Sequence, residues 1–164
     1  MKNILIIIIL LFLTSCSFEE ESVSFEDKYN GWISREDFLF RPSPFEELVN
    51  PAQVDLCAKM VYIQIESSID YVKESGDYWK TADETLFDGY GDCEDKAILM
   101  YVTLIRWGVD SSLMYLALIP DEGDYHCIIV VNEVRYFANS PEYQLAPILY
   151  IFGTDYFYKV DHGD

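Results

Sequence analysis

The sequence has few basic residues. Of its 164 residues, 11 are Lys or Arg and 29 are Asp or Glu, which gives a formal net charge of −18. Nucleic-acid binding and electrostatic docking on anionic lipid both need clustered Lys and Arg, so this balance excludes both. Hydrophobic residues still make up 51% of the chain and aromatic residues 16%, which is enough for the core of one domain. The negative charge is typical of a soluble surface, and it would also suit cations or basic partners.

The chain also lacks a hydrophobic run long enough to span a bilayer. The run Ile4–Leu13 has ten residues and follows the short basic start Met1–Asn3. A membrane span needs about 20 apolar residues, whereas this arrangement is typical of a signal peptide.

The residues Leu13–Cys16 then resemble the lipobox of bacterial lipoproteins, in which the Cys becomes the lipid-carrying N-terminus. The resemblance implies that Cys16 is lipidated and that the protein is anchored in the bacterial cell envelope, facing the periplasm or the exterior. An ordinary secretory signal with a chance Cys is the alternative.

Cysteine and histidine are scarce as well. The chain has Cys16, Cys57, Cys93 and Cys127, with no CxxC spacing and no Cys/His cluster that would suggest zinc. Lipid on Cys16 leaves an odd number, so at least one Cys stays unpaired. The two His are His126 and His162, and His162 lies near the chain end, where termini fray. His126 is therefore the candidate base for any thiol chemistry.

The exported chain divides into a tether with an arm and a following domain. Residues 17–27 contain five acidic residues with Ser between them, which is typical of a tether, and the aromatic, Pro-containing stretch 32–45 suits an extended arm. We therefore assign residues 1–15 to the signal peptide, 16–45 to the acidic tether and extended arm, and 46–164 to the domain.

Within the domain, helices precede strands. Asn50–Pro51 starts a helix that ends at Gly76, and its apolar face consists of Val54, Cys57, Val61, Ile65, Ile69 and Val72. A second helix is predicted over about 92–107, and strands over 112–119, 125–131, 134–138, 148–152 and 156–160. This order predicts an α+β fold with N-terminal helices packed on an antiparallel sheet.

Cys93 falls at the first turn of the second helix, where Asp92 suits the N-cap position. Free N–H groups and the macrodipole at a helix N-terminus favour a thiolate and lower the thiol pKa. The helix carries the chain roughly 21 Å away from Cys93 and the next strand returns it by roughly 23 Å. His126, at the start of the following strand, is therefore expected at the Cys93 end of the domain.

A turn at residues 132–133 predicts a third partner for this pair. A hairpin centred there pairs Val131 with Val134, and the same register places Asn139 opposite His126. A Cys, a His and an Asn at one end of the domain form the Cys–His–Asn arrangement of papain-like enzymes. A register slip of one residue would remove Asn139 from this set.

Three motifs occur together over roughly residues 50–160: Asp77–Tyr78–Trp79–Lys80–Thr81 with Glu84–Thr85, Gly91–Asp92–Cys93–Glu94–Asp95, and His126 in a hydrophobic strand. Together they resemble the transglutaminase-like superfamily, most of all the bacterial transglutaminase-like cysteine proteinases. The resemblance implies a papain-like fold with Cys93 as nucleophile and His126 as base. The family's acid would fall in 136–139, where this chain has no Asp or Glu, and Asn139 is the substitute.

The same resemblance implies a calcium site beside the nucleophile, with Asp92 and Glu94 as ligands. Carboxylates crowding Cys93 would raise the thiol pKa, and a structural Ca²⁺, which takes oxygen ligands, would reverse that effect. N-capping and solvation alone are the alternative role of these acids, and the chemistry itself requires no cofactor. Tyr78 and Trp79 are the candidate substrate-binding residues, although a packing role suits Trp79 better.

The sequence therefore predicts a lipid-anchored, cysteine-protease-like thiol hydrolase that cleaves a peptide or amide bond. Cys93 attacks the carbonyl, His126 serves as base and then as acid, and Asn139 orients His126. The expected partner is a protein or peptide substrate, with no nucleic acid, membrane contact through the lipid alone, and a monomeric state. Two alternatives stay open: a catalytically degenerate domain that binds a protein or peptide, and acyl transfer to an amine.

Overall fold

The computed structural model describes residues 24–36, 48, 50–73, 78–137, 139–153 and 156–161. Its helices and strands are α2 (Phe25–Ile33), α3 (Pro51–Ser68), β1 (Asp70–Tyr71), α4 (Ala82–Asp88), β2 (Tyr90–Gly91), α5 (Cys93–Arg106), η2 (Ser111–Leu113), β3 (Met114–Asp121), β4 (Asp124–Val131), β5 (Val134–Tyr136), α6 (Pro141–Leu145), β6 (Tyr150–Phe152) and β7 (Phe157–Lys159). The predicted signal peptide, the lipidation site Cys16 and His162 lie outside the described residues, so these stay predictions.

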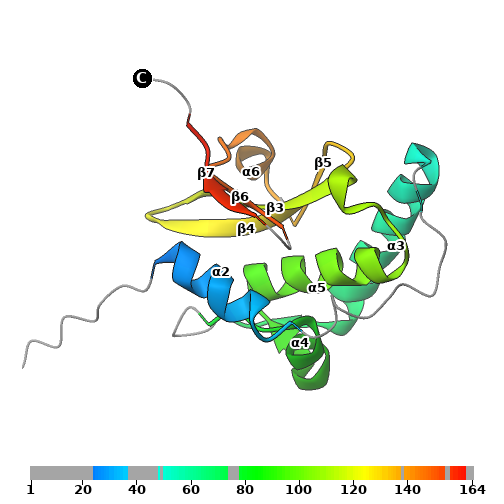
Figure 1. Cartoon of the computed structure of the whole chain (residues 1–164), viewed down its shortest axis with the longest axis horizontal. Coiled ribbons are helices and arrows are strands. Elements are labelled where there is room, and N and C mark those ends of the chain that lie inside the picture. The colour runs from blue at the N-terminus through cyan, green and yellow to red at the C-terminus, as the bar shows by residue number, and fades with distance from the viewer. Residues whose placement is uncertain are drawn as a thin grey trace, which may run out of the picture.

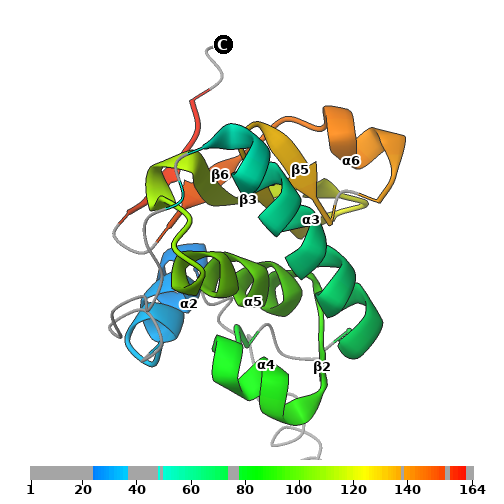
Figure 2. The ribbon, with the colours of Figure 1, turned by 90° about the vertical axis from the view of Figure 1, so that its right-hand side faces the viewer.

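An antiparallel sheet forms the middle layer of the fold, with the strand order β5-β4-β3-β6-β7 (Figure 1). The helix α6 lies on one face of the sheet, and α5 and α2 lie on the other. Figure 2 shows α3 lying across α5, and both helices contribute side chains to the larger hydrophobic core. A smaller core between the sheet and α6 contains Ile119 and Ile128. The α+β class and the antiparallel sheet are therefore confirmed.

The central helix α5 forms because its ends and its middle suit a buried helix. Asp92 precedes it as N-cap, and the Asp92 N–H donates to Asp95 Oδ2 at 3.4 Å, as in a capping box. Its residues from Ala97 to Val102 are all buried, so α5 contacts neighbours on every side. The predicted span of about 92–107 agrees with the observed helix.

The helix α3 begins where the sequence predicts and ends earlier. The Asn50 side chain accepts from the N–H groups of Ala52 and Gln53, and Pro51 occupies the first turn. The helix stops at Ser68 and not at Gly76, because the chain turns extended and β1 pairs with β2. Val72 is consequently 44% exposed and does not belong to the buried face.

Residues Phe25–Ile33 were expected in the tether and the extended arm, and the structure makes them the helix α2. The Ser24 side chain accepts from the Asp27 N–H and starts this helix. Trp32 is fully buried, and its indole N–H donates to the carboxylate of Glu36 at 3.1 Å. The Glu36 carboxylate also accepts from the Ala82 N–H at the start of α4, so α2 is packed into the domain.

Three short elements, β1, α4 and β2, precede Cys93, and the periodicity of the sequence does not predict them. Thr81 and Glu84 form a capping box that starts α4, and Gly89 ends this helix in the left-handed conformation, with φ of 72°. The parallel pair of β1 with β2 then places Tyr71 opposite Gly91, immediately before α5 begins.

The hairpin of β4 and β5 has the predicted register over part of its length. Val131 pairs with Val134, as expected from a turn at residues 132–133, but the ladder ends at Ile129 and Tyr136. The expected pairing of His126 with Asn139 is therefore not formed. The physical reason is that the residue after β5, Phe137, has a φ of 64°, which turns the chain out of the strand.

Among the described residues, no helix is both long and apolar enough to cross a membrane.

Candidate active site

Cys93 is the first helical residue of α5, as predicted. Its thiol donates to Glu94 Oε2 at 3.1 Å, and its sulfur accepts from the backbone N–H of Cys127 at 3.5 Å. Because Cys127 directly follows His126 on β4, the helix N-terminus and the start of this strand meet at the sulfur. Cys57, Cys93 and Cys127 all have free thiols.

The surroundings of Cys93 oppose ionisation of its thiol. Burial raises the pKa of Cys93 well above its ordinary value, and the charge of Glu94 raises it further. The hydrogen bond from the Cys127 N–H acts in the opposite direction and does not compensate. The expected lowering by the helix N-terminus is therefore corrected: burial and neighbouring carboxylates outweigh the macrodipole.

The carboxylates themselves are crowded. Asp92 and Glu94 are 7% and 8% exposed, and burial together with the charge of Asp92 raises the pKa of Glu94 to about 8. Two buried carboxylates side by side offer the oxygen donors that Ca²⁺ prefers. Within the described ranges, however, no group of three or more His, Cys, Asp or Glu side chains is arranged to hold a metal ion. Asp92 and Glu94 would supply two oxygen ligands to such an ion.

Asp95 fixes the start of α5 against the loop before α4. It is fully buried, accepts from the Lys80 N–H at 2.8 Å, and lies 4.0 Å from the Lys80 ammonium. Burial raises the pKa of Asp95 to about 7. A Cβ at Gly91 would lie 2.6 Å from the Asp95 Cβ, so this close approach of the backbone requires glycine.

His126 is half-buried at the start of β4, and its ring is held on two sides. Its Nε2 lies 2.7 Å from the carbonyl oxygen of Phe137. The ring stacks on Tyr143 of α6, with 4.4 Å between centroids and an angle of 18° between planes.

Asn139 lies close to this segment in the chain, and its hydrogen bond goes elsewhere. Its Oδ1 accepts from the Tyr62 hydroxyl of α3 at 3.1 Å. The Tyr62 ring also packs against the Phe137 ring, with centroids 5.1 Å apart. Asn139 is therefore bound to α3, while the hydrogen bond of His126 goes to Phe137.

The two predicted substrate-binding residues have different environments. Trp79 is 3% exposed and stacks on Phe152 at 5.1 Å, so its predicted contact with substrate is corrected to a role in core packing. Tyr78 is 48% exposed; its hydroxyl donates to Glu84 at 2.9 Å, and the Arg35 guanidinium also contacts that hydroxyl.

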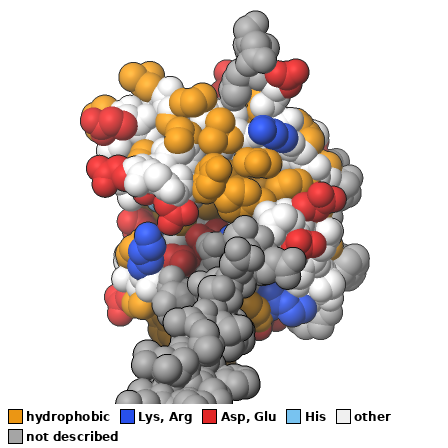
Figure 3. All heavy atoms as spheres, turned by 90° about the vertical axis from the view of Figure 1, so that its left-hand side faces the viewer, with side chains coloured by type: hydrophobic (Ala, Val, Ile, Leu, Met, Phe, Trp, Pro, Cys, Tyr) orange, Lys and Arg blue, Asp and Glu red, His pale blue; other side chains and the backbone are white. Residues whose placement is uncertain are grey.

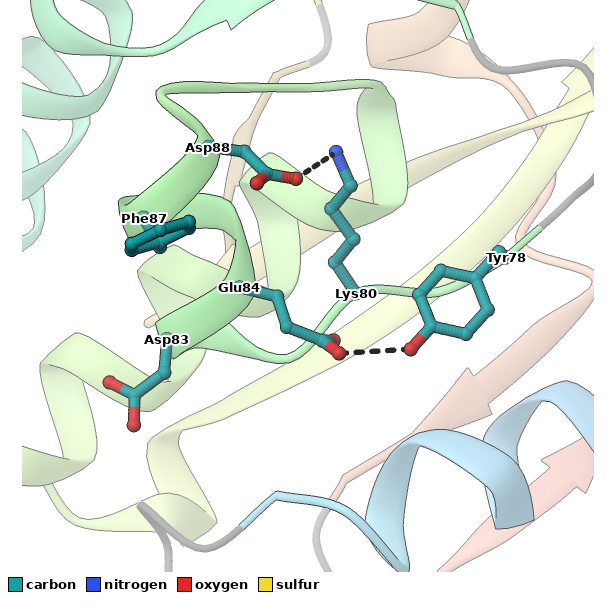
Figure 4. A pocket seen from close by; sticks show the side chains of 6 residues that line it. All are labelled: Tyr78, Lys80, Asp83, Glu84, Phe87 and Asp88. Carbon is teal, nitrogen blue, oxygen red and sulfur yellow. Dashed lines mark hydrogen bonds and ion pairs between the residues drawn. The ribbon is translucent and has the colours of Figure 1, made fainter.

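Tyr78 belongs to a surface pocket of about 400 Å³ beside α4, shown in Figure 4. The lining residues are Tyr78, Lys80, Asp83, Glu84, Phe87 and Asp88. The Lys80 ammonium lies 3.2 Å from the Asp88 carboxylate, as the dashed line in Figure 4 shows. Cys93 does not line this pocket, so any role of Tyr78 in binding would be exercised beside the thiol site and not within it.

Sequence reasoning missed two tyrosines near Cys93. Burial and then the charge of Cys93 raise the pKa of Tyr71 to about 12, although the residue as a whole is 58% exposed. The hydrogen bond of the Tyr143 hydroxyl to the Asp121 carboxylate raises the pKa of Tyr143 to about 12, and the charge of Cys93 adds to this. The pair Ser140–Pro141 signals a helix start before Tyr143, whereas the approach of either ring to Cys93 has no sequence signal.

The end of the molecule that carries the turn between β3 and β4 also gathers hydrophobic side chains, with acidic side chains around them (Figure 3). Tyr125, which precedes His126, packs edge-on against Phe25 of α2 at 4.6 Å. Phe25 in turn packs against Tyr150 at 5.3 Å, so aromatic rings from α2, β4 and β6 adjoin one another next to the site.

The α+β fold of this chain, with a central helix packed on an antiparallel sheet, is also found in solved structures. Legionella pneumophila LapG matches with a TM-score of 0.57 and 19% identity over 81% of this chain and 76% of that chain. Calcium-bound LapG matches with a TM-score of 0.55 and 19% identity over 84% and 80%. EGTA-treated LapG matches with a TM-score of 0.56 and 19% identity over 82% of this chain and 75% of that chain.

No protein-family model and no curated protein matches the sequence. At 19% identity, the likeness to LapG establishes the fold of this chain and nothing further.

Proposed function

We propose that this chain is a lipid-anchored thiol hydrolase of the bacterial cell envelope that cleaves a peptide or amide bond in a protein or peptide substrate. The observation that carries the proposal is the position of Cys93 at a helix N-terminus. Its sulfur lies 3.5 Å from the backbone nitrogen of Cys127, the residue that follows His126. The chain shares its fold with LapG, and the motifs around Trp79, Cys93 and His126 resemble those of the bacterial transglutaminase-like cysteine proteinases. The lipid on Cys16 rests on the lipobox resemblance.

In the proposed reaction, His126 takes the proton of the Cys93 thiol, and the sulfur attacks the carbonyl carbon of the substrate. The backbone N–H of Cys93 lies in the first turn of α5, where N–H groups have no acceptor within the helix, so it suits the developing oxyanion. His126 then gives its proton to the leaving amine, and a water molecule, activated by His126, cleaves the thioester.

A Ca²⁺ ion at Asp92 and Glu94 belongs to the same proposal. These two carboxylates are buried beside the thiol, and their negative charge raises the pKa of Cys93. A bound cation would supply the positive charge that favours the thiolate. One of the LapG structures is described as calcium-bound, which supports the choice of ion.

The proposal keeps Asn139 in a supporting role. It was predicted to orient His126, and its hydrogen bond to Tyr62 supports the segment that contacts the imidazole. Asn139 thus acts on His126 through Tyr62 and Phe137.

Alkylation of Cys93 by iodoacetamide, followed against pH by peptide mass mapping, tests the proposal. We expect labelling in the presence of Ca²⁺ to be faster than in EGTA, and to fall when His126 is replaced by Ala. Cys93→Ser is the control for site assignment. Labelling only above about pH 8, as for an ordinary thiol, and unchanged by His126→Ala, would contradict the proposal.

Two other functions have support of their own. The lack of Asp and Glu in 136–139 favours a degenerate domain that binds a protein or peptide without turnover. The same Cys–His pair would also suit acyl transfer to an amine. The labelling experiment separates the degenerate domain from both enzymes, and incorporation of an amine into a glutamine-containing peptide separates transfer from hydrolysis.

A further inference from the structure

The structure gives the imidazole of His126 a partner that the sequence does not predict, the main-chain carbonyl of Phe137. The distance from Nε2 to this oxygen is 2.7 Å. A carbonyl oxygen only accepts hydrogen bonds, so Nε2 carries the hydrogen of the contact. In the neutral ring, Nδ1 then keeps its lone pair and is the nitrogen that can take a proton from a thiol.

The carbonyl is aimed by an uncommon backbone conformation. Phe137 follows the last residue of β5 with a φ of 64°, in the left-handed region that non-glycine residues seldom adopt. Its side chain is 4% exposed, lies 5.1 Å from the Tyr62 ring, and has the Lys96 ammonium 5.9 Å from its centroid. These contacts hold the residue in a conformation that its own backbone preference opposes.

A second contact, from α6, holds the face of the His126 ring. Tyr143 stacks on His126 at 4.4 Å, and its hydroxyl binds the Asp121 carboxylate on β3. Arg135 donates to the carbonyl oxygens of Tyr143 and Ala146 at 2.9 and 2.8 Å and so holds α6 against the sheet. His126 is thus held at its edge by Phe137 and on its face by Tyr143.

We propose that the Phe137 carbonyl, aimed by the left-handed backbone and backed by the stacked Tyr143 ring, orients His126 in place of a side-chain carboxylate or amide. This inference rests on the proposed function, because it concerns the orientation of the base. A carbonyl fixes the tautomer as a carboxylate would, but it carries no full charge to stabilise the imidazolium. Phe137 and Tyr143 are positioning residues in this arrangement.

The substitutions Phe137→Gly and Phe137→Val separate the aim of the carbonyl from the packing of the ring. Glycine adopts a positive φ freely, whereas a β-branched residue is a genuine outlier there. Packing alone predicts the reverse order of damage, because Val fills more of the space left by the Phe ring than Gly does.

The first readout is the nitrogen-15 NMR spectrum of the imidazole, recorded on the full chain carrying His162→Gln, at a pH where the ring is neutral. We expect the Nε2–H tautomer alone in this parent and in Phe137→Gly, and a mixture of the two tautomers in Phe137→Val, as in an imidazole without a fixed partner. The second readout is iodoacetamide labelling of Cys93, which we expect to fall about tenfold in Phe137→Val, the scale of one lost hydrogen bond, and less in Phe137→Gly.

An Nδ1–H tautomer in the parent, or greater loss in Phe137→Gly than in Phe137→Val, would overturn the inference. An Nδ1–H tautomer in the parent overturns the inference even where Phe137→Val fails to fold. For Tyr143, Phe keeps the stacked ring and Leu removes it, so labelling should fall in Tyr143→Leu more than in Tyr143→Phe, and equal labelling would refute the stacking role.

The two proposals fail in different ways. Labelling that His126→Ala leaves unchanged contradicts the thiol hydrolase, whatever the tautomer. An Nδ1–H tautomer combined with labelling that depends on His126 contradicts the role of Phe137 alone.

Discussion

In EGTA, where no Ca²⁺ neutralises the carboxylate, replacing Glu94 by Gln should lower the pKa of the Cys93 thiol. The sulfur lies 3.1 Å from Glu94 Oε2, and both the charge of Glu94 and its hydrogen bond raise the thiol pKa. Two unit charges at this separation repel by about 1.3 kcal/mol at the dielectric constant of water and by about 5 kcal/mol at an effective value of about 20. At about 1.36 kcal/mol per pKa unit, the substitution should lower the pKa of Cys93 by about one to four units.

The sign of this effect depends on the charge of Glu94 where the thiol titrates. Because the pKa of Glu94 is about 8, its carboxylate is ionised at the alkaline pH where the raised pKa of Cys93 lies. The labelling rate of Cys93 at a fixed alkaline pH should therefore rise about tenfold or more in Glu94→Gln, since each pKa unit changes the thiolate fraction about tenfold. At acidic pH, where Glu94 is protonated, the difference between the two proteins should shrink.

Iodoacetamide labelling in EGTA across the pH range, mapped to the Cys93 peptide by mass spectrometry, measures this pKa directly. Glu133→Gln is the matched control, because it removes the same charge from an exposed position in the turn between β4 and β5. An unchanged or raised thiol pKa in Glu94→Gln, or an equal shift in Glu133→Gln, would refute the electrostatic reasoning.

Three further predictions concern stability. Gly91→Ala should lower the free energy of unfolding by about 1–3 kcal/mol, because the new Cβ would clash with Asp95; an unchanged thermal midpoint would count against this. Trp32→Ala should lower it by about 3–5 kcal/mol, as for a core residue, and an effect below 1 kcal/mol would place α2 outside the domain. The pKa values of Glu94 and Asp95 are raised to about 8 and about 7, so the folded chain binds more protons than the unfolded chain. Stability measured without divalent cations should therefore fall as the pH rises from about 4 to 8, more steeply in the parent than in Glu94→Gln, and parallel slopes would contradict the account.

Much of the fold could be predicted because local signals agreed with tertiary packing. Asn50–Pro51 and Asp92 both start helices in the structure, and the hairpin has the register expected from its turn. The end of α3 could not be predicted, since it is decided by the pairing of β1 with β2, two segments with no strong strand pattern. The helix α2 could not be predicted, because the acidic residues of its first turn are also typical of a tether, whereas the burial of Trp32 depends on tertiary packing.

The candidate site could be predicted only in its first two members. The helix start and the chain lengths brought Cys93 and the start of β4 to one end of the domain. The hydrogen bond of His126 depends on the backbone angle of Phe137, which no side-chain pattern encodes. Because of this angle, the partner of His126 is the Phe137 carbonyl and not the predicted Asn139. The thiol pKa also went against the prediction, because burial depends on tertiary structure and outweighs the local effect of the helix.

The proposed reaction depends on the charge of the Cys93 sulfur, because the thiolate is the nucleophile. The ultraviolet absorbance of the thiolate, taken as the difference between the parent and Cys93→Ser and followed against pH in Ca²⁺, reports it without any reagent. We expect the thiolate to appear at lower pH in the parent than in His126→Ala, and at lower pH in Ca²⁺ than in EGTA. Titration curves that coincide in the parent and in His126→Ala would contradict the assignment of Cys93 and His126 as a catalytic pair.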